Sequence, residues 1–115
     1  MGKYAIIKRS SEIRTILRTG KHVNSRHFKI VYQKTRGPES RSAILIGKKY
    51  GRAVERNRMK RRLREILRGI VPRLVVNLDL LIIPRKTREE ILFRLLREKV
   101  YSSLKMEGLL IDVSP

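Results

Sequence analysis

The chain has 115 residues, no cysteine and a formal net charge of +19, from 29 Lys and Arg against 10 Asp and Glu. This length predicts one domain, residues 1–115, with a single modest core. The composition excludes disulfides and thiolate metal sites, which fits a cytoplasmic protein, and the absence of an apolar run of about 18 residues argues against a membrane-spanning helix. A phosphate backbone is the commonest partner for so basic a surface.

The N-terminal third predicts a basic segment over residues 1–9, a short helix and then strands. Ser10 or Ser11 is placed to cap the helix, and Gly20 is placed to end it. One face of this helix is apolar and holds Ile13, Ile16 and Leu17. A brief strand is expected over residues 21–23.

Three further strands and a last helix are expected. Apolar and polar side chains alternate over residues 28–33, which is typical of a half-buried strand. The apolar run over residues 42–47 predicts its antiparallel neighbour, buried on both faces. Residues 78–83 predict another buried strand. Thr87 and Glu90 have the spacing of a capping box. The helix expected after them carries Ile91, Leu92, Leu95, Leu96, Val100 and Leu104.

The order helix, strands, helix, strand, helix predicts an α+β domain with a single sheet. A strand–helix–strand unit extends from Ser42 to Ile83. If its two strands are parallel, the general rule predicts that the connection crosses over in the right-handed sense.

The most informative stretch runs from Lys48 to Arg68 and contains ten Lys and Arg but only two acids. A turn at Tyr50 and Gly51 leads into a helix from about Ala53. At about 100° per residue, one stripe of this helix is apolar and comprises Met59, Leu63, Ile66, Leu67 and Ile70. The opposite side holds Asn57, Lys60, Arg61, Arg64 and Arg68, and one flank holds Arg58, Arg62 and Glu65.

The missing counter-charges on this helix favour a partner that supplies them, because like-charged i,i+4 pairs cost a few tenths of a kcal/mol each. A simply solvated face and a membrane-surface or calmodulin-type helix are the alternatives. The scarcity of acids argues against the first, and an apolar stripe without Trp or Phe argues against the second. We therefore favour nucleic acid. The amide of Asn57 both donates and accepts, so it could contact RNA, orient an arginine or simply face water.

A catalytic site on the protein itself is not expected. Metal-dependent phosphodiester cleavage needs clustered carboxylates, and no two acids form a recognisable ligand motif, so no metal site is predicted. Asp79 is expected to cap or to pair with an arginine. His22 and His27 could serve as acid and base in a metal-free ribonuclease, but loop histidines are more often ordinary surface residues. The residues indicate a binder.

The basic stretch resembles the signature of the bacterial ribonuclease P protein subunit, with its Arg-Asn-Arg motif. The matching positions are Lys48, Lys49, Gly51, Ala53, Val54, Arg56, Asn57, Arg58, Lys60, Arg61 and Arg64. The resemblance implies an α-β-β-β-α-β-α sandwich with a central mixed sheet and a left-handed β-α-β crossover, a fold shared with a domain of a small-subunit ribosomal protein. It replaces the right-handed default.

The same resemblance implies a small protein that joins a large catalytic RNA and assists removal of the 5′ leader from precursor tRNA. The RNA would do the chemistry and hold most of the Mg²⁺, so no catalytic residue is expected on the protein. The implied partners are ribonuclease P RNA and precursor tRNA, with no membrane and no required oligomer. A ribosomal or general RNA-binding protein without a role in cleavage is the alternative, since high basicity alone would fit it.

The resemblance also assigns two sets of site residues. RNA contacts are expected from Lys48, Lys49, Arg52, Arg56, Asn57, Arg58, Lys60, Arg61, Arg62, Arg64 and Arg68. A cleft between the first helix and the sheet would hold the single-stranded leader, and its expected lining is Ile13, Arg14, Leu17, Lys29 and Val31. Family members commonly have aromatic residues at several of these cleft positions, where bases can stack. We therefore expect leader binding here to rely more on Lys29 and Arg14.

Overall fold

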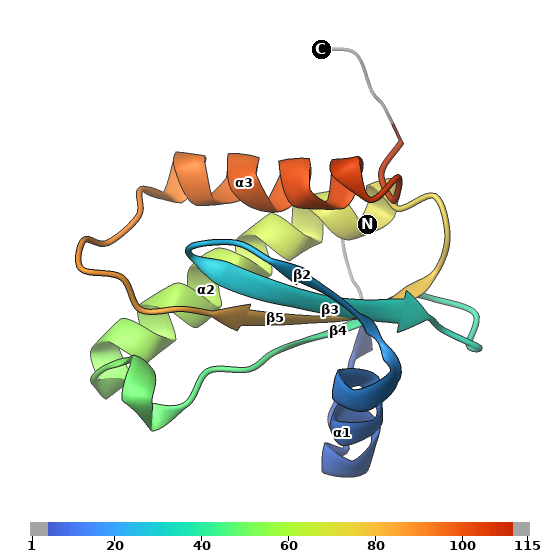
Figure 1. Cartoon of the computed structure of the whole chain (residues 1–115), viewed down its shortest axis with the longest axis horizontal. Helices are drawn as coiled ribbons and strands as arrows, with labels where there is room; N and C mark the ends of the chain where they lie inside the picture. The colour runs from blue at the N-terminus through green and yellow to red at the C-terminus, as the bar shows by residue number, and fades with distance from the viewer. Residues whose placement is uncertain (1–4, 112–115) are drawn as a thin grey trace.

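A five-stranded mixed sheet separates one helix from two others in this computed structural model, which describes residues 5–111 (Figure 1). The strands are β1 (Ala5–Ile6), β2 (Lys21–Asn24), β3 (Phe28–Lys34), β4 (Arg41–Ile44) and β5 (Leu78–Pro84). The helices are α1 (Ser10–Thr19), α2 (Ala53–Ile70) and α3 (Phe93–Met106), and two short 3-10 turns are η1 (Lys48–Tyr50) and η2 (Val71–Arg73). The α+β class is therefore confirmed.

The strands lie in the order β1-β4-β5-β3-β2. Strand β3 is antiparallel to both β2 and β5, whereas β4 is parallel to β5 and β1. The predicted antiparallel pairing of β4 with β3 is thus wrong. Strand β5 lies between them because it is buried along almost its whole length, whereas only Ser42 and Ala43 are buried in β4. The most apolar strand takes the position that both faces of the sheet cover.

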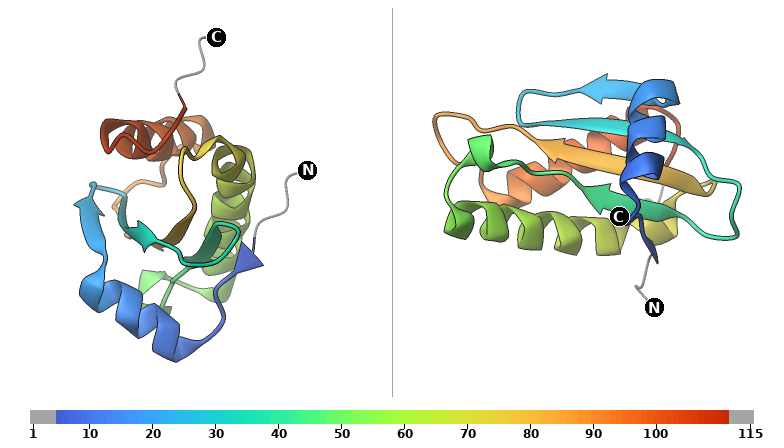
Figure 2. Two further views of the ribbon diagram at one scale, coloured as in Figure 1. Left: turned by 90° about the vertical axis from the view of Figure 1, so that its right-hand side faces the viewer. Right: turned by 90° about the horizontal axis from the view of Figure 1, so that it is seen from below.

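Alternate side chains of each strand point to opposite faces and build two cores. The larger core lies against α2 and α3 and takes from the sheet Phe28, Ile30, Leu78, Leu80 and Ile82. The smaller core lies under α1 and comprises Ile7, Ile16, Val31, Ala43 and Leu81. Figure 2 shows α1 on one side of the sheet and the other two helices on the opposite side. Full burial of one Val, Leu, Ile or Phe side chain in these cores contributes roughly 1.5–3 kcal/mol to the stability of the fold.

Helix α2 connects two neighbouring parallel strands, β4 and β5. In the right-hand view of Figure 2 both strands point left, β5 lies above β4, and α2 lies on the far side of the sheet from α1. The β4–α2–β5 connection is therefore left-handed, as the family resemblance implies and contrary to the general rule. This path places α2 along one long side of the molecule, with its outer face open.

The ends of α1 and α3 differ from the predicted caps. Helix α1 begins after Arg9 with no side-chain cap, so neither Ser10 nor Ser11 has the expected role. The capping box at Thr87 and Glu90 is also absent, because α3 begins only at Phe93. Thr87 Oγ1 donates to the carbonyl of Glu89 instead, and Glu90 pairs with arginines of α2. Two apolar residues of the predicted helix are exposed, Leu92 just before α3 and Leu95 within it.

Candidate nucleic-acid interface

Helix α2 is fixed to the core by the apolar stripe that its periodicity predicts. All five predicted stripe residues are buried, namely Met59, Leu63, Ile66, Leu67 and Ile70. The opposite side of the helix is exposed at Asn57, Arg61, Arg64 and Arg68. Burial of one side therefore holds a row of cations in fixed positions on the other, with the spacing of successive helical turns.

The N-terminus of α2 is locked by a small network. The carboxylate of Glu55 accepts from the backbone N–H of Arg52 at 2.8 Å and from Lys86 Nζ at 3.0 Å. These two hydrogen bonds lower the pKa of Glu55. Arg56 Nη1 donates to the carbonyl of Gly51 at 2.6 Å. Gly51 has a φ of +158°, which residues with a side chain rarely adopt, and a Cβ there would displace the Glu55 carboxylate, so this turn favours glycine. Arg56 therefore helps to build the turn that precedes the helix.

Three of the predicted RNA-binding arginines have acidic partners within the protein. Glu90, from the segment before α3, accepts from Arg58 at 3.1 Å and from Arg62 at 2.8 Å. Arg68 pairs with Glu65 at 3.3 Å. Exposed pairs of this kind contribute only about 0–1 kcal/mol each, so RNA phosphates can compete for these arginines. The network at Glu90 also ties the segment before α3 to the basic helix.

Five other cations of the predicted set have no such partner. Within residues 5–111, no side-chain hydrogen bond or ion pair is formed by Lys48, Lys49, Lys60, Arg61 or Arg64. The exposed side chain of Asn57 is also without a hydrogen bond in this part of the chain. The structure thus divides the predicted set into cations that hold the fold and cations that face solvent. The second group is free to bind phosphate oxygens.

A hollow of about 210 Å³ connects this face to the region of α1. Two of the free cations, Lys60 and Arg64, line one side of it, and Ile13 of α1 lines another. Ser42 also lines it, and its buried Oγ has no hydrogen-bond partner within the described residues.

The predicted cleft residues are placed unequally. Ile13 and Leu17 are partly buried and pack on the smaller core, and Arg14 is exposed. Val31 is fully buried beneath α1, so its predicted place in the lining of a leader cleft is corrected to that of apolar support. Lys29 lies two residues earlier on the same face of β3 and is only partly buried. Of the five predicted residues, only Ile13 lines the hollow described above.

Comparison with known proteins identifies the family of this chain. The family model described as Ribonuclease P matches residues 1–107. The ribonuclease P protein component of Finegoldia magna is 37% identical over 95 residues, covering 82% of each chain. That of Thermotoga maritima is 35% identical over 101 residues, covering 81% of this chain and 84% of the relative. This chain belongs to the ribonuclease P protein family.

Solved structures of ribonuclease P proteins share the fold. The Thermotoga maritima protein aligns with a TM-score of 0.78 at 29% identity, covering 93% of this chain and 97% of the other. The Staphylococcus aureus protein aligns with a TM-score of 0.84 at 24% identity, covering 95% and 100%, which shows the fold alone. The predicted role as the protein subunit of ribonuclease P, the enzyme that matures the 5′ end of tRNA, is confirmed.

The two histidines considered as a catalytic acid and base, His22 and His27, both contact other parts of this ribonuclease P protein. Nε2 of His22 lies 2.9 Å from the carbonyl oxygen of Leu17. Burial, and then the charges of Lys99 and Arg26, lower the pKa of His27. No group of three or more His, Asp or Glu within residues 5–111 could hold a metal ion. Within the same residues, no helix is long and apolar enough to cross a membrane.

Asp79 pairs with an arginine, as predicted. Its carboxylate accepts two hydrogen bonds from Arg41, each at 2.9 Å, and Arg41 also contacts Glu12 of α1 at 3.2 Å. This arrangement ties β4, β5 and α1 together. The role of Asp79 is therefore structural, because Arg41 forms ion pairs with the carboxylates of both Asp79 and Glu12.

Proposed function

We propose that the solvent-facing cations of α2 and η1 bind the catalytic RNA of ribonuclease P. The observation that carries this proposal is a set of five cations without internal partners. Lys60, Arg61 and Arg64 lie on α2, and Lys48 and Lys49 lie in η1 just before it. RNA phosphates supply the missing counter-charge, and release of their counterions drives binding. Arg58, Arg62 and Arg68 join this surface when RNA displaces their exposed carboxylate partners.

The same surface supports a path for the 5′ leader of precursor tRNA. Lys60 and Arg64 face both the outer side of α2 and the hollow beside α1, so the leader backbone would pass from the helix to that hollow. Ile13 offers an aliphatic contact there. Because aromatic stacking is absent from these positions, we propose that phosphate contacts supply most of the leader affinity.

We propose that Mg²⁺ is held by the RNA and that the protein contributes electrostatics. Of the acids in this chain, Glu12, Glu55, Glu65, Glu90 and Asp79 already accept from Lys or Arg, and this donor set does not fit a divalent ion. By neutralising phosphates at the contact, the cations would let precursor and catalytic RNA approach each other at lower Mg²⁺.

One copy of the chain presents the whole surface, so no oligomer is required. The cysteine-free sequence fits the cytoplasm.

Precursor-tRNA cleavage at low Mg²⁺ tests this proposal directly. The reaction is run with the protein alone, with a bacterial ribonuclease P RNA alone, and with both. We expect cleavage at the mature 5′ end only in the mixture. Cleavage by the protein alone would overturn the RNA-catalysed account, and no effect of added protein would point to another RNA partner.

Two double variants locate the contact. Lys60→Gln with Arg64→Gln removes two solvent-facing cations, and Arg36→Gln with Arg94→Gln removes two exposed arginines outside α2 and the hollow. Both variants carry the same net charge, so they keep the same long-range attraction for RNA. We expect the first to raise the Mg²⁺ needed for cleavage and the second to behave like the parent protein.

A further inference from the structure

A second groove lies on the other side of the C-terminal half of α2, where this helix meets η2 and α3. It measures about 810 Å³, within the roughly 300–1,000 Å³ range of pockets that bind small ligands. Its floor is apolar and comprises Ile66, Ile70, Phe93 and Tyr101, and its other lining residues are Glu65, Arg68, Gly69, Arg73, Arg97, Glu98 and Ser102. None of the predicted contacts to the catalytic RNA or the leader accounts for this groove, apart from Arg68 at its rim.

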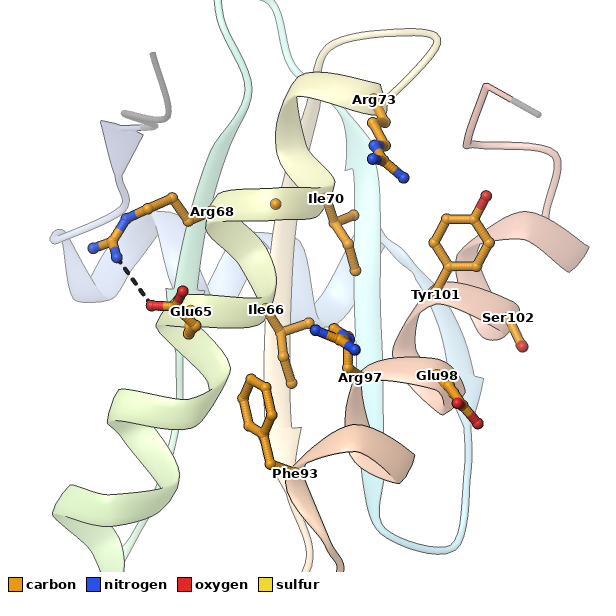
Figure 3. Close-up of a pocket in the computed structure, with 11 residues that line it drawn as sticks. Glu65, Ile66, Arg68, Ile70, Arg73, Phe93, Arg97, Glu98, Tyr101 and Ser102 are labelled. Atoms are coloured by element: carbon orange, nitrogen blue, oxygen red, sulfur yellow. Dashed lines mark hydrogen bonds and ion pairs between the residues drawn. The ribbon is translucent and has the colours of Figure 1, made fainter. Parts of the chain in front are cut away.

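The charges in the groove are arranged to receive an anion. Figure 3 shows Arg73 and Arg97 directed toward the space between the two helices, whereas Arg68 points the other way, toward its partner Glu65. Glu98 points away from that space. The guanidinium of Arg97 lies over the ring of Phe93, 5.7 Å from its centroid. Neither Arg73 nor Arg97 forms a side-chain hydrogen bond or ion pair within residues 5–111.

Aromatic rings next to arginines without acidic partners are the groups that bind single-stranded RNA. Bases stack on aromatic rings and on guanidinium planes, while their phosphates bind cations. The ring of Tyr101 and the stacked pair of Arg97 and Phe93 offer such surfaces beside two unpaired positive charges. An acidic peptide would use the arginines but would leave the aromatic surfaces without a matching group. The groove also continues the basic face of α2 at Arg68, so one RNA could extend from that face into it.

We propose that this groove binds one or two unpaired nucleotides of an RNA strand. Arg73 and Arg97 contact the phosphates, and a base packs against Tyr101 and the Arg97–Phe93 pair. The groove is a third RNA contact, separate from the solvent-facing cations and from the hollow beside α1. It does not depend on the proposed leader path, because none of its lining residues lines that hollow.

Photo-crosslinking tests the proposal with the full chain and a defined probe, a pentauridylate in which one base is 5-iodouridine. Mass spectrometry then maps the crosslinked residues. We expect crosslinks at Phe93 or Tyr101, and we expect them to persist in Lys60→Gln with Arg64→Gln. Persistence in that variant separates the groove from the surface assigned to catalytic RNA, so the two proposals can fail independently.

A charge-matched comparison supplies the second readout. Arg73→Gln with Arg97→Gln should lower the groove crosslink by about fivefold or more and reduce the salt dependence of pentauridylate binding by roughly 1.4 in slope, for two lost phosphate contacts. Arg36→Gln with Arg94→Gln removes the same charge outside the groove, and should change the groove crosslink by less than about twofold. All four arginines are exposed, so both variants should fold, which circular dichroism checks.

Two outcomes overturn the proposal. The first is the absence of any crosslink in the groove under conditions where the basic face of α2 is crosslinked. The second is an equal loss in the two charge-matched variants, which would show that net charge alone governs binding. Binding of hexaglutamate in the groove without RNA crosslinking there would identify an acidic peptide as the ligand and reject RNA.

Discussion

Arg41 and Asp79 form a two-pronged ion pair in which Nε and Nη2 of the arginine each donate to one carboxylate oxygen at 2.9 Å. Asp79 is buried near the start of β5, and Arg41 is mostly buried at the start of β4. Desolvation opposes such a pair, but breaking it leaves one charge buried without a partner. The pair therefore fixes the register of the two parallel strands that α2 connects.

Removal of the arginine should be far more costly than removal of its second partner. Arg41→Ala leaves the buried Asp79 carboxylate unpaired and should lower the free energy of unfolding by about 3 kcal/mol. Glu12→Gln loses only a half-exposed contact and should cost less than about 1 kcal/mol. Urea denaturation of both variants gives the comparison. Equal costs would show that Asp79 does not depend on Arg41.

The contact between Tyr32 and Glu107 predicts a loss of stability at high pH. Burial and, after it, the hydrogen bond to Glu107 at 2.6 Å raise the pKa of Tyr32 to about 12, from an ordinary value of 10.0. Between these values the unfolded chain loses this proton first, so the stability present below pH 10 declines as the pH rises toward 12. Tyr32→Phe should therefore lose less stability across this interval than the parent protein.

Urea denaturation at several values from about pH 8 to pH 12 measures this effect. Tyr101→Phe removes a tyrosine outside that hydrogen bond and serves as the control. It should keep the decline between pH 10 and pH 12 that the parent protein owes to Tyr32. A Tyr32→Phe curve parallel to the parent curve above pH 10 would contradict the assignment.

Paired and unpaired cations of α2 should respond differently to substitution. Lys60→Gln with Arg64→Gln removes cations without internal partners, and should reduce the salt slope of binding to ribonuclease P RNA by about 1.4–1.8. Arg58→Gln with Arg62→Gln removes the same charge but frees Glu90, so it should also loosen the segment before α3. Filter binding across a salt series and thermal unfolding separate the two effects. Identical behaviour in both assays would show that the ion pairs to Glu90 have no consequence.

Two glycines should respond in opposite directions to alanine. A Cβ on Gly20 would lie 2.7 Å from the carbonyl oxygen of Ile16 and 2.9 Å from that of Tyr32. Gly20→Ala should therefore push α1 away from the sheet and cost about 1–3 kcal/mol. Gly69 lies in α2 with open space around it, so Gly69→Ala should stabilise by about 0.5–1 kcal/mol. Urea denaturation tests both signs, and a stable Gly20→Ala variant would contradict the close packing of α1 on β3.

The elements with the strongest local patterns were predictable from the sequence. Periodicity alone placed the buried face of α2, and the continuous apolar run of residues 78–83 indicated a buried strand. The pairing of β4 was not predictable, because local sequence does not say which strand will occupy the centre of a sheet. The capping box at Thr87 failed because Glu90 reaches two arginines of α2, a long-range contact that no local rule contains.

The candidate site was predictable as a set of residues but not as an arrangement. The predicted set included every cation of α2, yet it did not separate Arg58 and Arg62, which pair with Glu90, from Lys60 and Arg64, which do not. The groove between α2 and α3 was also hidden, since α3 is distant in the sequence from α2 and η2 and meets them only in the fold. Sequence spacing within one helix reveals a face, whereas a groove requires knowledge of the packing.

The unneutralised cations on α2 give ionic strength two opposing effects on this protein. In the free chain, dissolved salt screens the mutual repulsion of neighbouring cations on α2 and so favours the folded helix. In the proposed complex, the same salt weakens the attraction between those cations and RNA. Conditions that best preserve the isolated subunit are therefore the ones that most readily dissociate it from its RNA, and bound RNA should itself act as the stabilising counterion by raising the melting temperature of the chain.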